Sequence, residues 1–144
     1  MVGARSFTQD GKRVTRKLVT EISSNNIVIV SGLARGIDTI AHTTTVQNKQ
    51  RTIEVLGSGL DIIYPAENPK LAESILENGT IISEFPVGTK PEASNFPKRN
   101  RIISGLCRAT VVVEAGNKSG AILTALNAVD QNREIFAVPG RIVD

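Results

Sequence analysis

The sequence predicts an α/β fold of three layers, with a mostly parallel sheet and helices on both of its faces. Short β-branched apolar runs alternate along the chain with longer amphipathic segments. Most of these runs are continuously apolar, which is typical of strands buried on both faces. Alternation of strands and helices favours a parallel sheet. The 144 residues suffice for one such domain with a sizeable core.

The strands are predicted at five apolar runs, which cover residues 27–30, 52–56, 80–82, 110–113 and 135–138. Before the first run, Val14, Leu18 and Ile22 recur every four residues and form the apolar face of a helix. The opposite face of that helix, which we interpret as solvated, carries Lys12, Arg13, Arg16 and Lys17. Further helices are predicted over residues 35–47, 68–78, 96–107 and 119–132.

The composition excludes several classes of protein. No apolar run approaches the ~18 residues of a membrane span, and no charged leader precedes an apolar stretch as in a secretion signal. The single cysteine, Cys107, permits neither an internal disulfide nor a cysteine-based zinc site. We therefore predict a cytoplasmic protein without a metal site, a cofactor or a membrane contact.

The charge is mildly basic, with a net value of +3 from 17 basic and 14 acidic residues. This balance permits a polyanionic partner without requiring one, so the placement of the positive charges matters more than their sum. Four Phe, one Tyr and no Trp are too few for an extended platform on which bases stack.

Small or polar residues follow every predicted strand. They are Ser31-Gly32, Gly57-Ser58-Gly59, Ser83-Glu84, Glu114-Ala115-Gly116 and Pro139-Gly140. The carboxyl ends of parallel strands form a crevice where ligands bind, and the helix N-termini beside it favour anions. A single loop of this kind indicates only a tight turn. Several at one edge favour an anion or nucleotide site.

The first dense cluster contains Ser31, Gly32, Arg35, Gly36 and Asp38. We expect Arg35 in the first turn of the following helix, where it could clamp a phosphate that the helix amides also hold. Asp38 either orients Arg35, accepts a hydrogen bond from a ribose or base, or is simply a favourable first-turn acid. The solitary histidine, His42, is expected to be packed or solvated because no catalytic partner accompanies it.

The second cluster contains Phe96, Lys98, Arg99, Asn100 and Arg101. Arginine can bridge phosphate oxygens with two hydrogen bonds, and Phe96 can stack on an unpaired base. Asn100 can read a base or position a neighbour. A run of charges is most often a solvated helix face, but the adjoining Phe-Pro and the embedded Asn favour a functional interpretation here.

The third cluster, residues 114–120, lies at a strand end and a helix start. A phosphate-binding P-loop needs glycine directly before the Lys-Ser pair, and Asn117 stands there instead. Lys118, Ser119 and Gly120 could still hold one phosphate without a metal. The glycines of residues 57–59 begin a dinucleotide fingerprint, but Ile62 replaces its third glycine. Gly3 and Arg5 would lie at the mouth of the same crevice.

In this order, the clusters resemble the DNA-processing protein A (DprA/Smf) family along essentially the whole chain. The matching segments are residues 3–6, 31–42, 52–59, 64–65, 68, 83–84, 96–105, 118–125 and 136–140. Many motifs in register make the resemblance specific. It implies a Rossmann-like domain that binds single-stranded DNA in a basic pocket and is not an enzyme. It also implies homodimers that load a RecA-type recombinase during natural transformation.

By position, the resemblance implies pocket residues at Gly3, Arg5, Ser31, Gly32, Arg35, Gly36, Phe96, Lys98, Arg99, Asn100, Arg101, Lys118, Ser119 and Gly120. Asp38, Ser83, Glu84 and Glu114 are expected to support them. The chain departs from the family at Ala66-Glu67, where relatives often carry a lysine. Both ends look cut, with almost no strand before Gly3, so we expect a single domain over residues 1–144 without the helical and winged-helix regions that often flank it.

A rival interpretation is enzymatic. The chain also resembles the cytokinin-activating phosphoribohydrolases, which split a nucleoside monophosphate into base and ribose phosphate. Those enzymes carry a glutamate on the helix after the third cluster, but residues 121–124 contain no carboxylate here. Acid–base catalysis would therefore fall to Glu114 or Glu84. A third interpretation is a protein-interaction domain with a vestigial pocket.

Overall fold

The computed structural model describes residues 1–140, and every predicted strand and helix is present. The helices are α1 (Gln9–Ser24), α2 (Ile37–Gln47), α3 (Pro69–Asn78), α4 (Asn95–Gly105) and α5 (Gly120–Asp130). The strands are β1 (Ile29–Ser31), β2 (Thr52–Val55), β3 (Thr80–Ile82), β4 (Ala109–Val112) and β5 (Glu134–Ala137). Their ends lie within two residues of the predicted ends.

All strand pairs are parallel, with β2 between β1 and β3, and with β4 beside β5. The first two residues connect these groups. Val2 forms a parallel bridge with Val112, and the Met1 amine donates to the Val30 carbonyl oxygen at 3.0 Å. Although the sequence shows almost no strand before Gly3, these two residues lie inside the sheet. A segment of two residues is too short to display the alternating pattern by which a strand is predicted.

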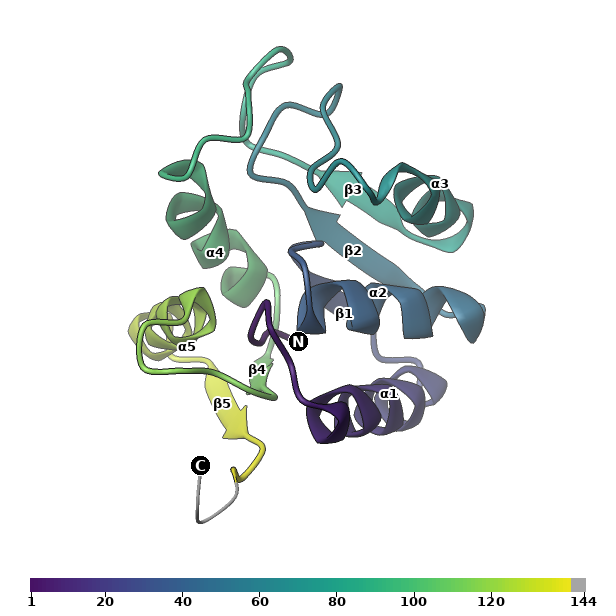
Figure 1. The fold of residues 1–144 in the computed structure, drawn as a ribbon, viewed down its shortest axis with the longest axis vertical. Coiled ribbons are helices and arrows are strands. Elements are labelled where there is room, and N and C mark those ends of the chain that lie inside the picture. The colour runs from purple at the N-terminus through teal and green to yellow at the C-terminus, as the bar shows by residue number, and fades with distance from the viewer. Residues whose placement is uncertain (141–144) are drawn as a thin grey trace.

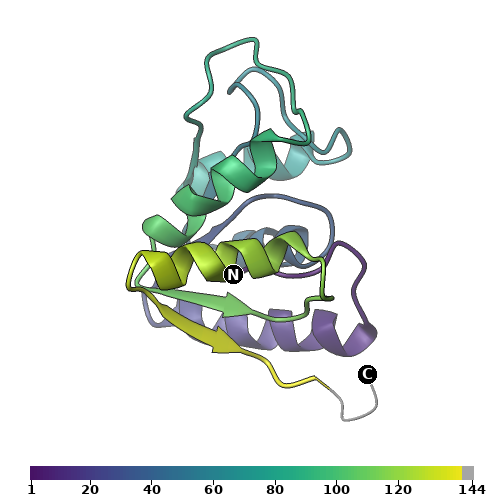
Figure 2. The ribbon, with the colours of Figure 1, turned by 90° about the vertical axis from the view of Figure 1, so that its left-hand side faces the viewer.

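Helices cover both faces of the sheet (Figures 1 and 2). On one face, Val19 of α1 and Ile37 of α2 pack in a core with Ile29. On the other, Ile103 of α4 packs in a second core with Val30. Successive residues of β1 thus serve opposite cores, as expected for a strand buried on both sides. In Figure 2, α4 and α5 lie above β4 and β5, and α1 lies behind these two strands.

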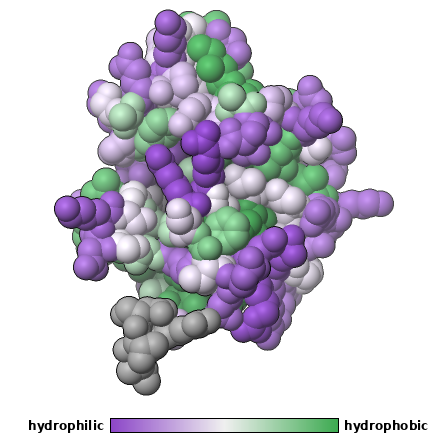
Figure 3. All heavy atoms as spheres, viewed as in Figure 1, coloured by the Kyte–Doolittle hydropathy of each residue, from purple (hydrophilic) through white to green (hydrophobic). Residues whose placement is uncertain are grey.

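The inner strand β1 is buried on both faces as predicted, but the edge strand β5 is not. β1 is buried throughout, whereas β5 exposes Glu134, Phe136 and Ala137. An apolar run does not reveal whether a strand will lie at the edge of its sheet. The surface over α1 is hydrophilic, at the lower right of Figure 3, and Arg13, Arg16 and Lys17 are exposed there as predicted.

The topology reverses once beside the first two residues. From Met1–Val2 the chain moves outward through β1, β2 and β3, and α4 then returns it to the other side of Val2, where β4 and β5 follow. Such a reversal opens a crevice at the carboxyl ends of the strands. No helix within residues 1–140 is long and apolar enough to cross a membrane.

Candidate functional site

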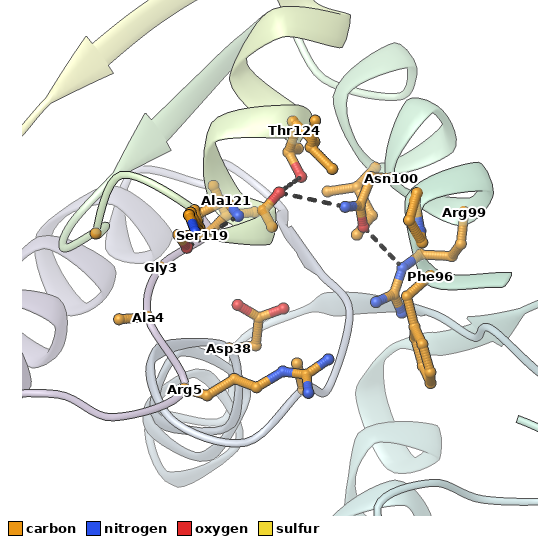
Figure 4. Close-up of a pocket in the computed structure, with 18 of the residues that line it drawn as sticks. Gly3, Ala4, Arg5, Asp38, Phe96, Arg99, Asn100, Ser119, Ala121 and Thr124 are labelled. Atoms are coloured by element: carbon orange, nitrogen blue, oxygen red, sulfur yellow. Dashed lines mark hydrogen bonds between the residues drawn. The ribbon is translucent and has the colours of Figure 1, made fainter. Parts of the chain in front are cut away.

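A cavity of about 580 Å³ lies at this reversal (Figure 4). Its walls come from the loop after Val2, the start of α2, one side of α4, and the loop and first turns of α5. The predicted site residues that line it are Gly3, Arg5, Asp38, Phe96, Arg99, Asn100, Lys118, Ser119 and Gly120. Segments far apart in the sequence therefore share one site.

A smaller adjoining hollow is lined by Arg5, Gly32, Arg35, Tyr64 and Phe96. The Tyr64 and Phe96 rings lie with their centroids 5.5 Å apart. The guanidinium of Arg5 lies 6.0 Å from the Phe96 centroid, and that of Arg35 lies 5.9 Å from the Tyr64 centroid. Two cations thus flank a pair of aromatic rings.

Two cations at the cavity are unpaired. Arg5 and Lys118 are exposed and form no ion pair within the described part of the chain. Both line the cavity, Arg5 from the loop after Val2 and Lys118 from the loop before α5. They are free to meet an anion from two sides.

Arg99 is fastened inside the fold. Its side chain forms part of the cavity wall, but the residue is only 4% exposed. Nη1 donates to the carbonyl oxygens of Gly32 at 2.9 Å and Val55 at 2.6 Å. Burial lowers the pKa of Arg99, and the carboxylates of Asp38 and Glu54 oppose that shift. We therefore revise the predicted phosphate contact of Arg99: it ties α4 to the ends of β1 and β2.

Asn100 continues this connection. Its Oδ1 accepts from Arg99 Nε at 3.1 Å, and its Nδ2 donates to the Gly120 carbonyl oxygen at 3.4 Å (Figure 4). Of the two roles predicted for Asn100, positioning a neighbour is the one these contacts favour.

Of the four residues 98–101 predicted in the pocket, only Arg99 and Asn100 line the cavity. Lys98 and Arg101 are exposed and do not line the cavity. Arg101 pairs with Glu84, and the Ser83 hydroxyl donates to the Ser58 carbonyl oxygen at 2.6 Å. The helical turn of α4 separates these residues from Arg99 because positions 98 and 101 share a different face.

Arg35 precedes α2 and does not lie in its first turn. Gly36, with a φ of +88°, turns the chain before the helix begins at Ile37. A Cβ at Gly36 would lie 2.2 Å from a backbone oxygen, so the residue shapes the loop. Arg35 Nε pairs with Glu67 Oε1 at 2.5 Å. Glu67, in the segment where the family often has a lysine, is therefore its partner in place of Asp38.

Two further predicted site residues, Ser31 and Glu114, do not line the cavity and form hydrogen bonds within the fold. The buried Ser31 hydroxyl donates to the carbonyl oxygen of the first residue at 2.6 Å. Glu114 accepts from the Thr8 N–H at 3.0 Å and the Thr8 hydroxyl at 2.6 Å, just before α1. His42 is fully buried, as one of its two expected placements, and burial lowers its pKa to about 3.

The loop before α5 leaves room at the cavity. Ser119 caps the helix, and its hydroxyl accepts from the Ala121 N–H at 3.2 Å. A Cβ added to Gly116 or Gly120 would meet nothing within 4 Å. Packing in the protein therefore does not require these glycines, which leaves close approach of a ligand to the helix N-terminus as a reason for them.

Asp38 is the one acidic side chain among the described residues that line the cavity. Glu84 and Glu114, the acids considered for hydrolysis, do not line it. The sequence predicted Asp38 as a supporting residue that orients Arg35, accepts a hydrogen bond from a ribose or base, or is simply a first-turn acid. Within residues 1–140, no cluster of three His, Cys, Asp or Glu side chains is arranged to hold a metal.

Comparison with known proteins identifies the family. The model for DNA recombination-mediator protein A matches residues 1–144. The chain belongs to this DprA/Smf family. It is 52% identical over 139 residues to Protein Smf of Synechocystis, covering 96% of this chain and 35% of that protein. It is 43% identical over 144 residues to DNA processing protein DprA of Streptococcus pneumoniae, covering all of this chain and 51% of the relative.

Solved DprA structures confirm the Rossmann-like fold. The X-ray structure of the Streptococcus pneumoniae protein superposes with a TM-score of 0.90 at 43% identity, over 99% of this chain and 50% of that one. DNA processing protein A of Helicobacter pylori, in a structure concerned with its single-stranded DNA binding mode, gives 0.91 at 34% identity, over 98% and 64%. The chain thus spans about half of the Streptococcus pneumoniae protein, 35% of the Synechocystis protein and 64% of the Helicobacter pylori chain.

Proposed function

We propose that this domain binds single-stranded DNA in the cavity and the adjoining hollow. The observation that carries the proposal is the meeting of unpaired Arg5 and Lys118 with the Phe96 ring at one opening. The single-stranded DNA binding mode described for the Helicobacter pylori relative supports it.

The chemistry divides between phosphate and base. Arg5 can hold a phosphate through two parallel hydrogen bonds, and Lys118 with the N-terminus of α5 can hold a second anionic group. An unstacked base can lie on Phe96 or Tyr64, because base–aromatic stacking tolerates any sequence. A duplex would have to unstack before a base reached these rings, so the site suits a single strand.

We further propose the biological setting that the family implies. The domain would act in DNA processing, competence and recombination in the cytoplasm, as part of a homodimer that passes its strand to a RecA-type recombinase during natural transformation. Binding, without catalysis, is sufficient for that task, and the two glutamates considered for hydrolysis lie outside the cavity.

The proposal is tested by fluorescence-anisotropy titration with a labelled single strand and the matching duplex at two salt concentrations. We expect the single strand to bind more tightly, with affinity that falls steeply as salt rises because counterions are released from phosphates. Equal affinity for both forms, or affinity insensitive to salt, would reject it.

A further inference from the structure

The acidic side chain of Asp38 is not expected in a site that binds only phosphate. It lies in the first turn of α2, is 6% exposed, and is the only acid that lines the cavity among residues 1–140. Figure 4 shows its carboxylate turned into the cavity, between Arg5 and the first turn of α5. A carboxylate at this point repels a phosphate and attracts N–H donors.

The carboxylate is held in a fixed position. The Gly32 N–H donates to Oδ2 at 3.1 Å, which uses one of about four acceptor positions on the two oxygens. Burial raises the pKa of Asp38, and the nearby charge of Arg99 opposes that shift. Since Arg99 is itself bonded to two backbone carbonyls, the environment of Asp38 is set by the scaffold.

The distribution of charge implies an orientation for a bound nucleotide. Arg5 and Lys118 are exposed at the opening and attract its phosphate, whereas Asp38 is buried in the wall. A cavity of about 580 Å³ lies in the range of sites that enclose a small ligand. A nucleotide that keeps its phosphate on the cations would therefore turn its base toward Asp38.

We propose that Asp38 reads the Watson–Crick edge of one base and that the cavity prefers guanine there. Guanine offers two adjacent donors, N1–H and the N2 amino group, which match the two oxygens of one carboxylate. Adenine and cytosine offer an amino group beside an acceptor, and thymine offers a single N–H between two acceptors. This inference rests on the proposed binding of single-stranded DNA and adds a base preference to it.

The test uses short thymine oligonucleotides that carry one central dG, dA, dC or dT, titrated against the wild-type protein and Asp38→Asn. In the wild type, the dG strand should bind about tenfold more tightly than the dT strand, the discrimination typical of a good two-pronged contact. The Asn variant keeps an oxygen for the Gly32 N–H but replaces the other acceptor with a donor. It should lose the dG preference while still binding the dT strand.

Two controls separate base reading from a structural effect. Asp130→Asn makes the same chemical change at an exposed position outside the cavity, and should leave the order of affinities unchanged. Inosine lacks the N2 amino group and should bind the wild-type protein less tightly than dG, a comparison that does not depend on the folding of Asp38→Asn.

The outcomes are distinct. Equal affinity of the wild type for all four strands, or an unchanged dG preference in folded Asp38→Asn, would overturn the assignment of Asp38 and leave single-strand binding intact. Failure of the wild type to bind any strand would overturn the proposed function and this inference together.

Discussion

The guanidinium of Arg99 donates to the carbonyl oxygen of Gly32 at 2.9 Å, and a Cβ on Gly32 would lie 2.7 Å from the Arg99 Cζ. The absence of a side chain at position 32 thus allows α4 to sit directly on the end of β1. The Phe96 ring, one turn before Arg99, lies 5.4 Å from its guanidinium. The buried guanidinium of Arg99 thus helps to position α4 and, with it, the Phe96 ring at the cavity.

Arg99→Ala should destabilise the fold by about 3 kcal/mol, because it leaves the buried Asp38 without the compensating charge of Arg99. It also removes the donor to the carbonyl oxygens of Gly32 and Val55. Urea denaturation measures this. Lys98→Ala, at the exposed neighbouring position, should change the free energy of unfolding by no more than about 0.5 kcal/mol. Similar, small effects of both variants would show that Arg99 does not act as a structural tie.

Glu67→Gln should strengthen single-strand binding about two- to fivefold, because it releases Arg35 from an exposed ion pair of the usual modest strength. Arg35→Ala should weaken binding. Anisotropy titration at low salt measures both, with Glu73→Gln on the exposed side of α3 as the control. If Glu67→Gln and Glu73→Gln bind alike, Arg35 does not contact the strand.

Gly120→Ala should leave stability nearly unchanged and weaken DNA binding, since the added methyl group has open space in the protein but occupies the approach to the N-terminus of α5. Gly36→Ala should instead lower the free energy of unfolding, because position 36 has a φ of +88°, which disfavours any residue with a Cβ. Thermal unfolding and titration of both variants compare them. Full DNA affinity in Gly120→Ala would count against phosphate binding at this helix.

Glu54 should make stability depend on pH. It is fully buried without a hydrogen-bond partner for either oxygen among the described residues, and burial raises its pKa from 4.5 to about 7. Between pH 4.5 and about 7, folded Glu54 therefore keeps a proton that the unfolded chain releases. The contribution of this group to stability is full below pH 4.5 and is lost as the pH rises to about 7.

The pH effect can be isolated with Glu54→Gln, which stays neutral throughout. Its stability relative to the wild type should rise by roughly 2 to 3 kcal/mol between pH 5 and pH 8, at about 1.4 kcal/mol for each unit of pKa shift. Urea denaturation at the two pH values measures the difference, and the exposed Glu77→Gln should show none. A constant offset between Glu54→Gln and the wild type would mean that Glu54 is already ionised in the fold.

Much of this architecture could be predicted because the signals for each strand and loop lie in a few neighbouring residues. Each strand is a short apolar run followed by glycine or a small polar residue, so the strand ends and the loops around the cavity could be placed from the sequence. Gly3, Arg5, Phe96 and the 118–120 loop line the cavity where the strand order implied they would. The general location of the site follows from topology, which a pattern of elements nearly determines.

The roles of individual charges were not predictable from a run of residues. Arg99 and Arg101 are two positions apart, yet one is buried against carbonyl oxygens and the other pairs with Glu84 at the surface. Helical spacing applied to Ile102-Ile103 would have indicated that Lys98 and Arg101 share an outer face. The pairing of Arg35 with Glu67 and the buried position of Asp38 depend on long-range contacts.

Occupation of the cavity by a single strand is tested most directly by amide chemical-shift mapping with a short thymine oligonucleotide. We predict the largest shifts at Gly3 to Arg5, at Phe96, and from Lys118 to Ala121, all of which line the cavity. Shifts confined to the exposed basic face of α1, around Arg13 and Lys17, would contradict it and place the DNA on a different surface.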